Sequence, residues 1–159
     1  MSREITHAAQ GPFEHAYGLL MEYVDVCPDN VWAEKNGGWP VWQQVGHAIM
    51  VMDFFVRGED EALLPAPCDM DTLMLKTQGA PVAHKKVMRD YAAAVKSRVD
   101  AWLAGMSDER LVGNNAALSK KIGRDLSYMA TVIMLASHTN YHLGACDAAL
   151  RDHGLKGVF

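Results

Sequence analysis

The sequence predicts an all-α protein, most simply a four-helix bundle, and three observations lead to this prediction. Four long segments place apolar side chains at steps of three and four residues, which is the spacing of one helix face. No stretch of strand length shows a convincing alternation of apolar and polar residues. The chain of 159 residues is the size of one domain. We therefore expect residues 1–159 to form a single helical domain.

The first two predicted helices are delimited by proline and glycine. The first spans residues 8–26 and ends before Pro28. The second spans residues 40–57, because Pro40 suits a first helical turn and Gly58 is a usual helix-stopping residue. This second helix is apolar nearly all round, so we expect it to be deeply buried. The apolar stripe of the first helix consists of Phe13, Tyr17, Leu20 and Val24.

The third and fourth predicted helices are amphipathic. The third spans residues 81–104, and the fourth spans residues 121–153 and closes at Gly154. The stripe of the third helix contains Met88, Tyr91, Val95, Val99 and Trp102, and that of the fourth contains Tyr128, Val132, Leu135, His138 or Thr139, His142, Cys146 and Ala149. Histidines therefore lie on the apolar face of the fourth helix.

The connections between these helices are unequal in length. Residues 58–80 form a long connection, which should contain a short helix and which resembles the crossovers of four-helix bundles. Before the fourth helix, Ser107 can cap one short helical turn, and the chain then becomes irregular at residues 113–115.

Composition excludes several classes of partner. The net charge is −4 and the 15 basic residues are dispersed, which argues against a nucleic-acid or anionic-membrane surface. No run is long enough to cross a bilayer, and residues 1–10 lack the apolar core of a signal peptide, so we expect a cytoplasmic protein. The three cysteines, Cys27, Cys68 and Cys146, are far apart, as is typical of reduced thiols.

The segment HTNYH places His138 and His142 four residues apart. Residues at this spacing lie on one helix face with Cβ atoms roughly 5–6 Å apart, so both rings could reach one metal ion. His47 on the second helix is the best third ligand, because a histidine on so apolar a helix needs partners for its ring nitrogens. Three histidines would leave at least one coordination position open, as in catalytic zinc sites.

Other interpretations of these residues stay open at this point. Hydrogen-bonded structural histidines would have the same spacing as metal ligands. The metalloprotease motif HExxH does not apply, because Thr139 stands where that motif needs its glutamate. Cys146 lies one turn beyond His142 and could be either a buried core residue or a further ligand.

Two sequence patterns resemble the DinB-like (DinB/YfiT-like) superfamily of metalloenzymes. One is WPVWQQVGHA, in which His47 follows Trp39 by eight residues, and the other is HTNYHLG from His138 to Gly144. The resemblance implies an up-down-down-up four-helix bundle, often dimeric, whose three histidines bind a divalent metal ion. It assigns the ligands to His47, His138 and His142. Many relatives have an acidic residue and a glutamine where this chain has Thr139 and Ala145.

The resemblance also implies the classes of activity to test. Members include transferases and isomerases that depend on low-molecular-weight thiols. We therefore expect a metal-dependent enzyme that acts on a small molecule, either as a thiol-dependent transferase or as a hydrolase. Zinc, nickel, iron and copper all suit three imidazoles. The alternatives are a metal-binding or small-ligand-binding bundle without turnover, and a bundle with purely structural histidines. Asp53, Glu14 and Glu22 are the carboxylates that could approach the site as an acid or base.

Overall fold

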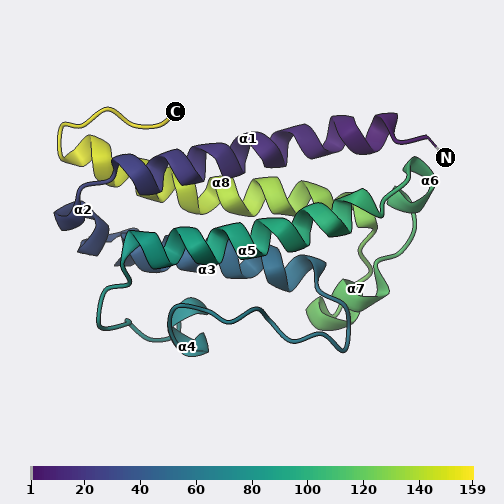
Figure 1. The fold of residues 1–159 in the computed structure, drawn as a ribbon, viewed down its shortest axis with the longest axis horizontal. Coiled ribbons are helices and arrows are strands. Elements are labelled where there is room, and N and C mark those ends of the chain that lie inside the picture. Colours follow the sequence, from purple (N-terminus) through teal and green to yellow (C-terminus); the bar gives the residue numbers. More distant parts are fainter. Residues whose placement is uncertain (1) are drawn as a thin grey trace.

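The computed structural model describes residues 2–159, and these are mostly helical (Figure 1). The all-α prediction is therefore confirmed at the level of fold class. The four long helices are α1 (Glu4–Val26), α3 (Val41–Val56), α5 (Lys85–Ala104) and α8 (Tyr128–Asp152). Shorter elements connect them: α2 (Asp29–Ala33), α4 (Met70–Leu73), α6 (Asp108–Leu111), α7 (Ala116–Ile122), and a hairpin of β1 (Lys35–Asn36) and β2 (Trp39–Pro40).

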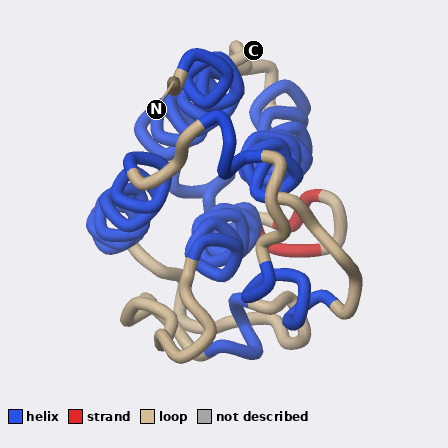
Figure 2. Tube along the Cα trace, turned by 90° about the vertical axis from the view of Figure 1, so that its right-hand side faces the viewer, coloured by secondary structure: helices blue, strands red, loops and turns tan. Residues whose placement is uncertain are grey.

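The long helices pack around one apolar core. Helix α8 contacts α1 and α3, and helix α5 contacts α3 and α1, so each long helix has two long neighbours. Figure 2 views these helices nearly along their axes. Helices α1 and α8 run in one direction and α3 and α5 in the other (Figure 1). The predicted stripes face this core, which includes Phe13, Leu20, Val24, Met88, Val95, Val99, Val132 and Leu135.

Helix α3 is the most deeply buried element. Every residue of α3 except His47 and Phe54 is buried, as its uniformly apolar sequence predicts. Helices α5 and α8 cover two of its sides, and α4 contacts it as well. Helix α4 belongs to the connection between α3 and α5, which therefore contains the predicted short helix. The polar side chains of α3 must consequently find partners inside the protein.

Several helix boundaries differ from the predicted ones. The fourth long helix begins at Tyr128 rather than at residue 121, because Gly123 ends α7 in a left-handed conformation with φ +76° and Ser127 caps the new helix. The third begins at Lys85 rather than at residue 81. There the Ala83 carbonyl accepts a hydrogen bond of 2.8 Å from the Trp32 indole instead of a helical one.

Two further departures have local causes. The hairpin β1–β2 was not predicted, because strands of two residues are too short to show any alternation. Its turn is formed by Gly37 and Gly38, whose φ angles are +61° and +95°. In the described chain, residues 2–159, none of the helices combines the length and the apolar character that crossing a membrane requires.

Helix α1 begins four residues earlier than predicted because a distant segment caps it. Arg3 at the N-cap makes no side-chain capping bond. Instead, the Asp108 carboxylate of α6 accepts hydrogen bonds of 2.9 Å from both the backbone N–H and the hydroxyl of Thr6, and one of 2.6 Å from the Ser2 hydroxyl. Burial by itself raises the pKa of Asp108, but these bonds outweigh it and lower the pKa to about 2.

We predict that Asp108→Asn lowers the melting temperature at neutral pH and that this difference narrows in acid. Because the pKa of Asp108 is lowered from 3.8 to about 2 on folding, its stabilisation is fully present above about pH 4 and is lost as the pH falls toward 2. Thermal unfolding followed by circular dichroism between pH 2 and pH 7 measures this. Glu109→Gln, at the neighbouring carboxylate, is the control, and an equal effect of Asp108→Asn at every pH would contradict the assignment.

Candidate metal centre

The structure brings the three predicted histidines together between α3 and α8. His47, His138 and His142 each offer one ring nitrogen, and these three atoms all lie within 4.8 Å of one another. The centroid of the His142 ring lies 4.7 Å from the centroid of the His47 ring and 4.7 Å from that of the His138 ring. The centroids of His47 and His138 are 5.2 Å apart. Three imidazoles at this separation can converge on a single ion.

Helix α8 positions its two histidines by simple periodicity. His138 and His142 are one turn apart, so both rings project from the face of α8 that packs toward α3. Thr139 lies beside them and is fully buried, and its hydroxyl donates a hydrogen bond of 2.7 Å to the Leu135 carbonyl. Thr139 therefore satisfies its own polar group within the helix, and its hydroxyl hydrogen is not directed at the histidines.

His47 is oriented by the connection that follows α3. Its Nδ1 atom lies 2.6 Å from the Leu73 carbonyl oxygen at the end of α4. A carbonyl oxygen can only accept, so Nδ1 carries the proton and Nε2 keeps a free lone pair. Helix α4 also packs closely on the preceding position, because a Cβ atom on Gly46 would lie 2.9 Å from the Leu73 side chain and would force that side chain to shift. This arrangement leaves Nε2 of His47 as its available metal ligand.

Gln43 holds the segment that orients His47. It lies one turn before His47 on α3 and is fully buried. Its Nε2 atom donates hydrogen bonds of 2.7 Å to the carbonyls of Thr72 and Thr77, and its Oε1 atom accepts one of 3.1 Å from the Gly79 N–H. The Thr72 carbonyl immediately precedes the Leu73 carbonyl that contacts His47. One glutamine side chain thus fixes the position of the hydrogen-bond partner of His47.

The electrostatic environment keeps the histidines neutral. Burial and, as the smaller cause, the neighbouring His47 together lower the pKa of His138 to about 4. Burial, followed by His47 and His138, lowers the pKa of His142 to about 3. Burial also lowers the pKa of His47, against the opposing effect of its bond to Leu73. At neutral pH all three rings therefore present unprotonated nitrogens, which is the form that binds metal ions.

A buried nitrogen of this cluster has no partner. Nδ1 of His142 is inaccessible to solvent and makes no hydrogen bond with any residue in the described range 2–159. Leaving a polar atom in this state costs free energy, and native structures rarely do so without a reason. A bound cation would supply the missing interaction at this cluster. The residues present therefore fit a divalent metal ion.

Aromatic rings border the cluster on two sides. The Phe55 ring packs edge-on against His138, with centroids 5.9 Å apart, and the Tyr141 ring packs edge-on against His142, with centroids 5.0 Å apart. Phe55 is buried, whereas Tyr141 is 76% exposed. His138 is half-buried. The histidines are thus shielded by Phe55 on one side and lie close to solvent beside Tyr141.

The other side chains that the sequence singled out lie elsewhere. Cys146 is fully buried in the hydrophobic core, and burial raises the pKa of its thiol well above the ordinary value. Asp53 is fully buried and bonded to Arg98, at 2.7 Å. Glu14 pairs with Lys96, and Glu22 is exposed on α1. Trp39 is half-buried in β2, directly before α3.

Sequence reasoning missed three contributors to the site: Gln43, the Leu73 carbonyl and Tyr141. Tyr141 could have been found, because it lies one turn after His138 within HTNYH. Gln43 offered only a weak signal, a second polar residue one turn before His47 on an otherwise apolar helix. The Leu73 carbonyl offered none, because a backbone oxygen has no sequence signature.

The fold and this cluster define a class: a helical protein whose buried histidines could hold a metal ion. Comparison with known families agrees with that class. Residues 13–146 match the DinB superfamily, and the chain belongs to it. No curated protein and no solved structure matches the sequence.

We predict that His138 and His142 of the metal-free protein remain neutral well below pH 6.5. In the unfolded chain both histidines have the ordinary pKa of about 6.5, whereas in the folded protein the pKa is about 4 for His138 and about 3 for His142. The unfolded state therefore binds more protons than the folded state between about pH 3 and pH 6.5. The free energy of unfolding is therefore highest above pH 6.5, and this advantage is lost as the pH falls through about 4 for His138 and about 3 for His142. Imidazole NMR titration together with urea unfolding measures both effects; midpoints near 6.5 for both rings would contradict the burial argument.

Proposed function

We propose that the chain binds one divalent metal ion through His47, His138 and His142. The observation that carries this proposal is the convergence of three neutral imidazoles from two helices. One of these imidazoles, that of His142, has a buried nitrogen without a partner among residues 2–159. Zinc, nickel and iron are the favoured ions, because borderline imidazole ligands suit all three. The bond from His47 to Leu73 supports the assignment, since ligating histidines commonly donate their other N–H to a carbonyl or carboxylate.

The proposed architecture is an up-down-down-up four-helix bundle in which residues 1–159 form one DinB-like domain. The opposite directions of the α1–α8 and α3–α5 pairs support it (Figure 1), as does the family match over residues 13–146. A homodimer is also proposed, as the resemblance implies. Ile133 on α8, which is 57% exposed, provides apolar surface for such contact.

The proposed activity is metal-dependent chemistry on a small molecule, either a thiol-dependent transfer or a hydrolysis. When bound, a divalent ion with an open coordination position supplies Lewis-acid activation of a thiol or water. The protein would contribute orientation, through the Leu73 carbonyl on His47, and exclusion of water, through Phe55 beside His138. Tyr141 borders the exposed side, where a small molecule could approach.

A metal-binding or small-ligand-binding protein without turnover is the second candidate, and one observation favours it. Of the carboxylates considered as acid or base, Asp53 is paired with Arg98, Glu14 is paired with Lys96 and Glu22 is exposed. The melting temperature, measured with a panel of low-molecular-weight thiols in the presence and absence of metal, separates the enzyme from the binding protein. A thiol that binds selectively to the folded state raises the apparent stability. Stabilisation by a thiol only with metal present, together with turnover of an electrophile, supports the transferase.

We predict that protein purified without an affinity tag contains about one metal ion per chain and that His142→Ala loses it while remaining helical. Two remaining imidazoles should hold the ion much more weakly than three, because binding depends on the number of converging ligands. Elemental analysis and far-ultraviolet circular dichroism measure the two properties. His15→Ala, on the exposed side of α1, is the matched control. Absence of metal from the parent, even after reconstitution with zinc, nickel and iron, would refute the site.

We predict that Gln43→Met weakens metal binding by at most about 10- to 100-fold, the usual effect of losing the outer hydrogen-bond partner of a metal ligand, because Gln43 acts on that partner rather than on His47 itself. The substitution releases the α4 segment and with it the Leu73 carbonyl that orients His47. Competition with a chelator measures the affinity.

Gln44→Met is the matched control for this substitution. Gln44 is also buried and also donates to backbone carbonyls, but its partners are Asn36 and Trp39 in the hairpin. Equal loss of affinity in the two variants would show that general destabilisation, rather than the orientation of His47, is responsible.

A further inference from the structure

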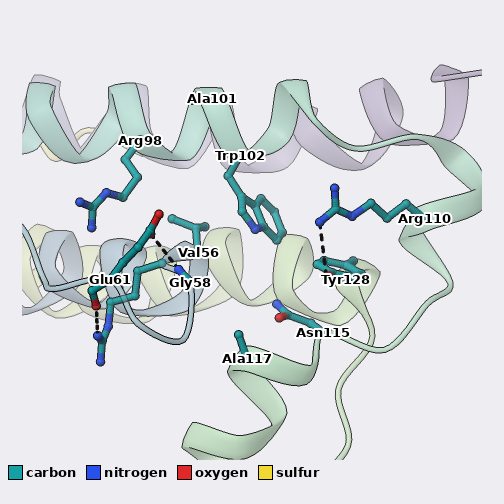
Figure 3. A pocket seen from close by; sticks show the side chains of 11 residues that line it. Val56, Gly58, Glu61, Arg98, Ala101, Trp102, Arg110, Asn115, Ala117 and Tyr128 are labelled. Atoms are coloured by element: carbon teal, nitrogen blue, oxygen red, sulfur yellow. Dashed lines mark hydrogen bonds between the residues drawn. The ribbon is translucent and has the colours of Figure 1, made fainter.

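A cavity of about 330 Å³ lies between α5 and the ends of α3 and α8. Figure 3 shows Arg98 and Trp102 projecting from the same side of α5 toward this space, with Tyr128 of α8 and Asn115 before α7 opposite them. Its volume is at the lower end of the range found for small-molecule sites. The cavity is therefore large enough for a compact organic ligand.

This cavity is separate from the histidine cluster. On α3, Val56 lines the cavity and follows His47 by nine residues, which corresponds to about 14 Å along a helix. On α8, Tyr128 lines it and precedes His138 by ten residues, or about 15 Å. The two sites thus lie about two and a half helical turns apart along α3 and nearly three along α8. A ligand in one does not require the other to be occupied.

Positive charge is concentrated around the cavity. Its lining includes three arginines, Arg57, Arg98 and Arg110, and one carboxylate, Glu61. The chain as a whole carries a net charge of −4, so this excess of cations is a local departure from its average. Lys121 adds to it, because its amino group donates to the Arg57 carbonyl at 2.7 Å. Such a lining favours a negatively charged ligand.

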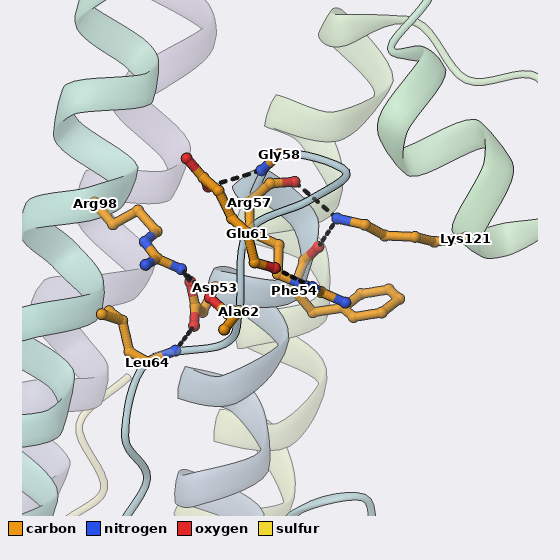
Figure 4. Close-up of polar contacts among 9 residues, drawn as sticks. All are labelled: Asp53, Phe54, Arg57, Gly58, Glu61, Ala62, Leu64, Arg98 and Lys121. Carbon is orange, nitrogen blue, oxygen red and sulfur yellow. Dashed lines mark hydrogen bonds and ion pairs between the residues drawn. The ribbon is translucent and has the colours of Figure 1, made fainter.

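The arginines keep free donors despite their internal bonds. Figure 4 shows Arg98 bonded to Asp53 and Arg57 bonded to the Glu61 carbonyl. Arg98 uses Nη1 for both Asp53 and the Ala62 carbonyl, and a guanidinium carries five N–H donors in all. Arg98 is also balanced by Asp53, so Arg110, which is exposed, supplies the most available positive charge.

Two aromatic rings, whose planes are tilted by 43° to each other, give the cavity an apolar wall. The rings of Trp102 and Tyr128 contact each other with centroids 5.9 Å apart. The Arg110 guanidinium lies over the Tyr128 ring, 4.8 Å from its centroid, and its Nη2 atom donates to the Tyr128 hydroxyl at 3.4 Å. Both rings are only half-buried, so part of each face is free to pack against a ligand.

From this combination we propose that the cavity binds a small organic carboxylate with a flat apolar body. The carboxylate would accept charge-assisted hydrogen bonds from Arg110, and the body would pack against Trp102 and Tyr128. Glu61 is the acidic residue in the lining. Its carboxylate accepts a hydrogen bond of 2.8 Å from the Gly58 N–H, and this backbone donor partly offsets its negative charge. This binding site is independent of the proposed metal site.

The test uses benzoate as the probe, with benzamide and inorganic phosphate as matched comparisons. Isothermal titration calorimetry gives the affinities, and the indole N–H resonance of Trp102, assigned with Trp102→Phe, reports the location. We expect benzoate to bind with a Kd of about 1 mM or below and to shift the Trp102 resonance. Benzamide should bind at least about tenfold more weakly, because it lacks the negative charge. His142→Ala should bind benzoate as the parent does, which separates this result from any failure of the metal site.

Arg110→Gln should weaken benzoate binding about tenfold, since it removes a charged hydrogen-bond donor. Arg124→Gln, at another exposed arginine that does not line the cavity, should leave it unchanged. Several results would overturn the proposal: no benzoate binding up to about 10 mM, equal binding of benzamide, phosphate binding without benzoate binding, or an Arg110→Gln variant that binds as the parent does. Helical content by circular dichroism confirms that each variant is folded.

Discussion

The near-complete burial of α3 is the constraint on which the rest of the structure depends. A helix enclosed by α5, α8 and α4 cannot satisfy its polar side chains with water, so each must find a partner in a neighbouring segment. Gln43 bonds to the segment around α4, Gln44 to the hairpin, and Asp53 to Arg98 of α5 and to the Leu64 N–H. His47 bonds to the Leu73 carbonyl with one nitrogen. Because α3 is buried, each of these polar side chains bonds to a neighbouring segment and fixes the position of that segment relative to α3.

The histidine cluster follows from the same constraint. On α8, the rings of His138 and His142 lie 5.2 and 4.7 Å from the His47 ring, measured between ring centroids. Because burial and mutual proximity disfavour a positive charge, the three rings stay neutral and concentrate lone pairs in one small volume. Such an arrangement gains little from hydrogen bonding alone, whereas a divalent ion would interact favourably with all three rings.

The sequence predicted the features of the fold and of the histidine cluster that depend on helical periodicity. Helical spacing placed His138 and His142 on one face of α8, and the apolar character of residues 40–57 predicted the burial that makes His47 unusual. It failed where a distant contact decides the structure. The first turn of α1 is capped from α6 by Asp108. The break at Gly123 between α7 and α8 is a different kind of failure, because it has a local cause that the prediction of one helix over residues 121–153 overlooked. The bonds of Gln43 and the cavity beside Trp102 also depend on segments brought together only by folding.

X-ray absorption at the metal edge of the loaded protein tests the three-histidine site most directly. For zinc, the three-histidine site predicts about three nitrogen ligands near 2.0–2.1 Å, with the outer-shell scattering of imidazole rings and room for one further light atom. A sulfur ligand near 2.3 Å would contradict it, because Cys146 would then take part despite its place in the core. A shell of oxygen ligands without imidazole scattering would equally contradict it, because the ion would then be bound elsewhere on the chain.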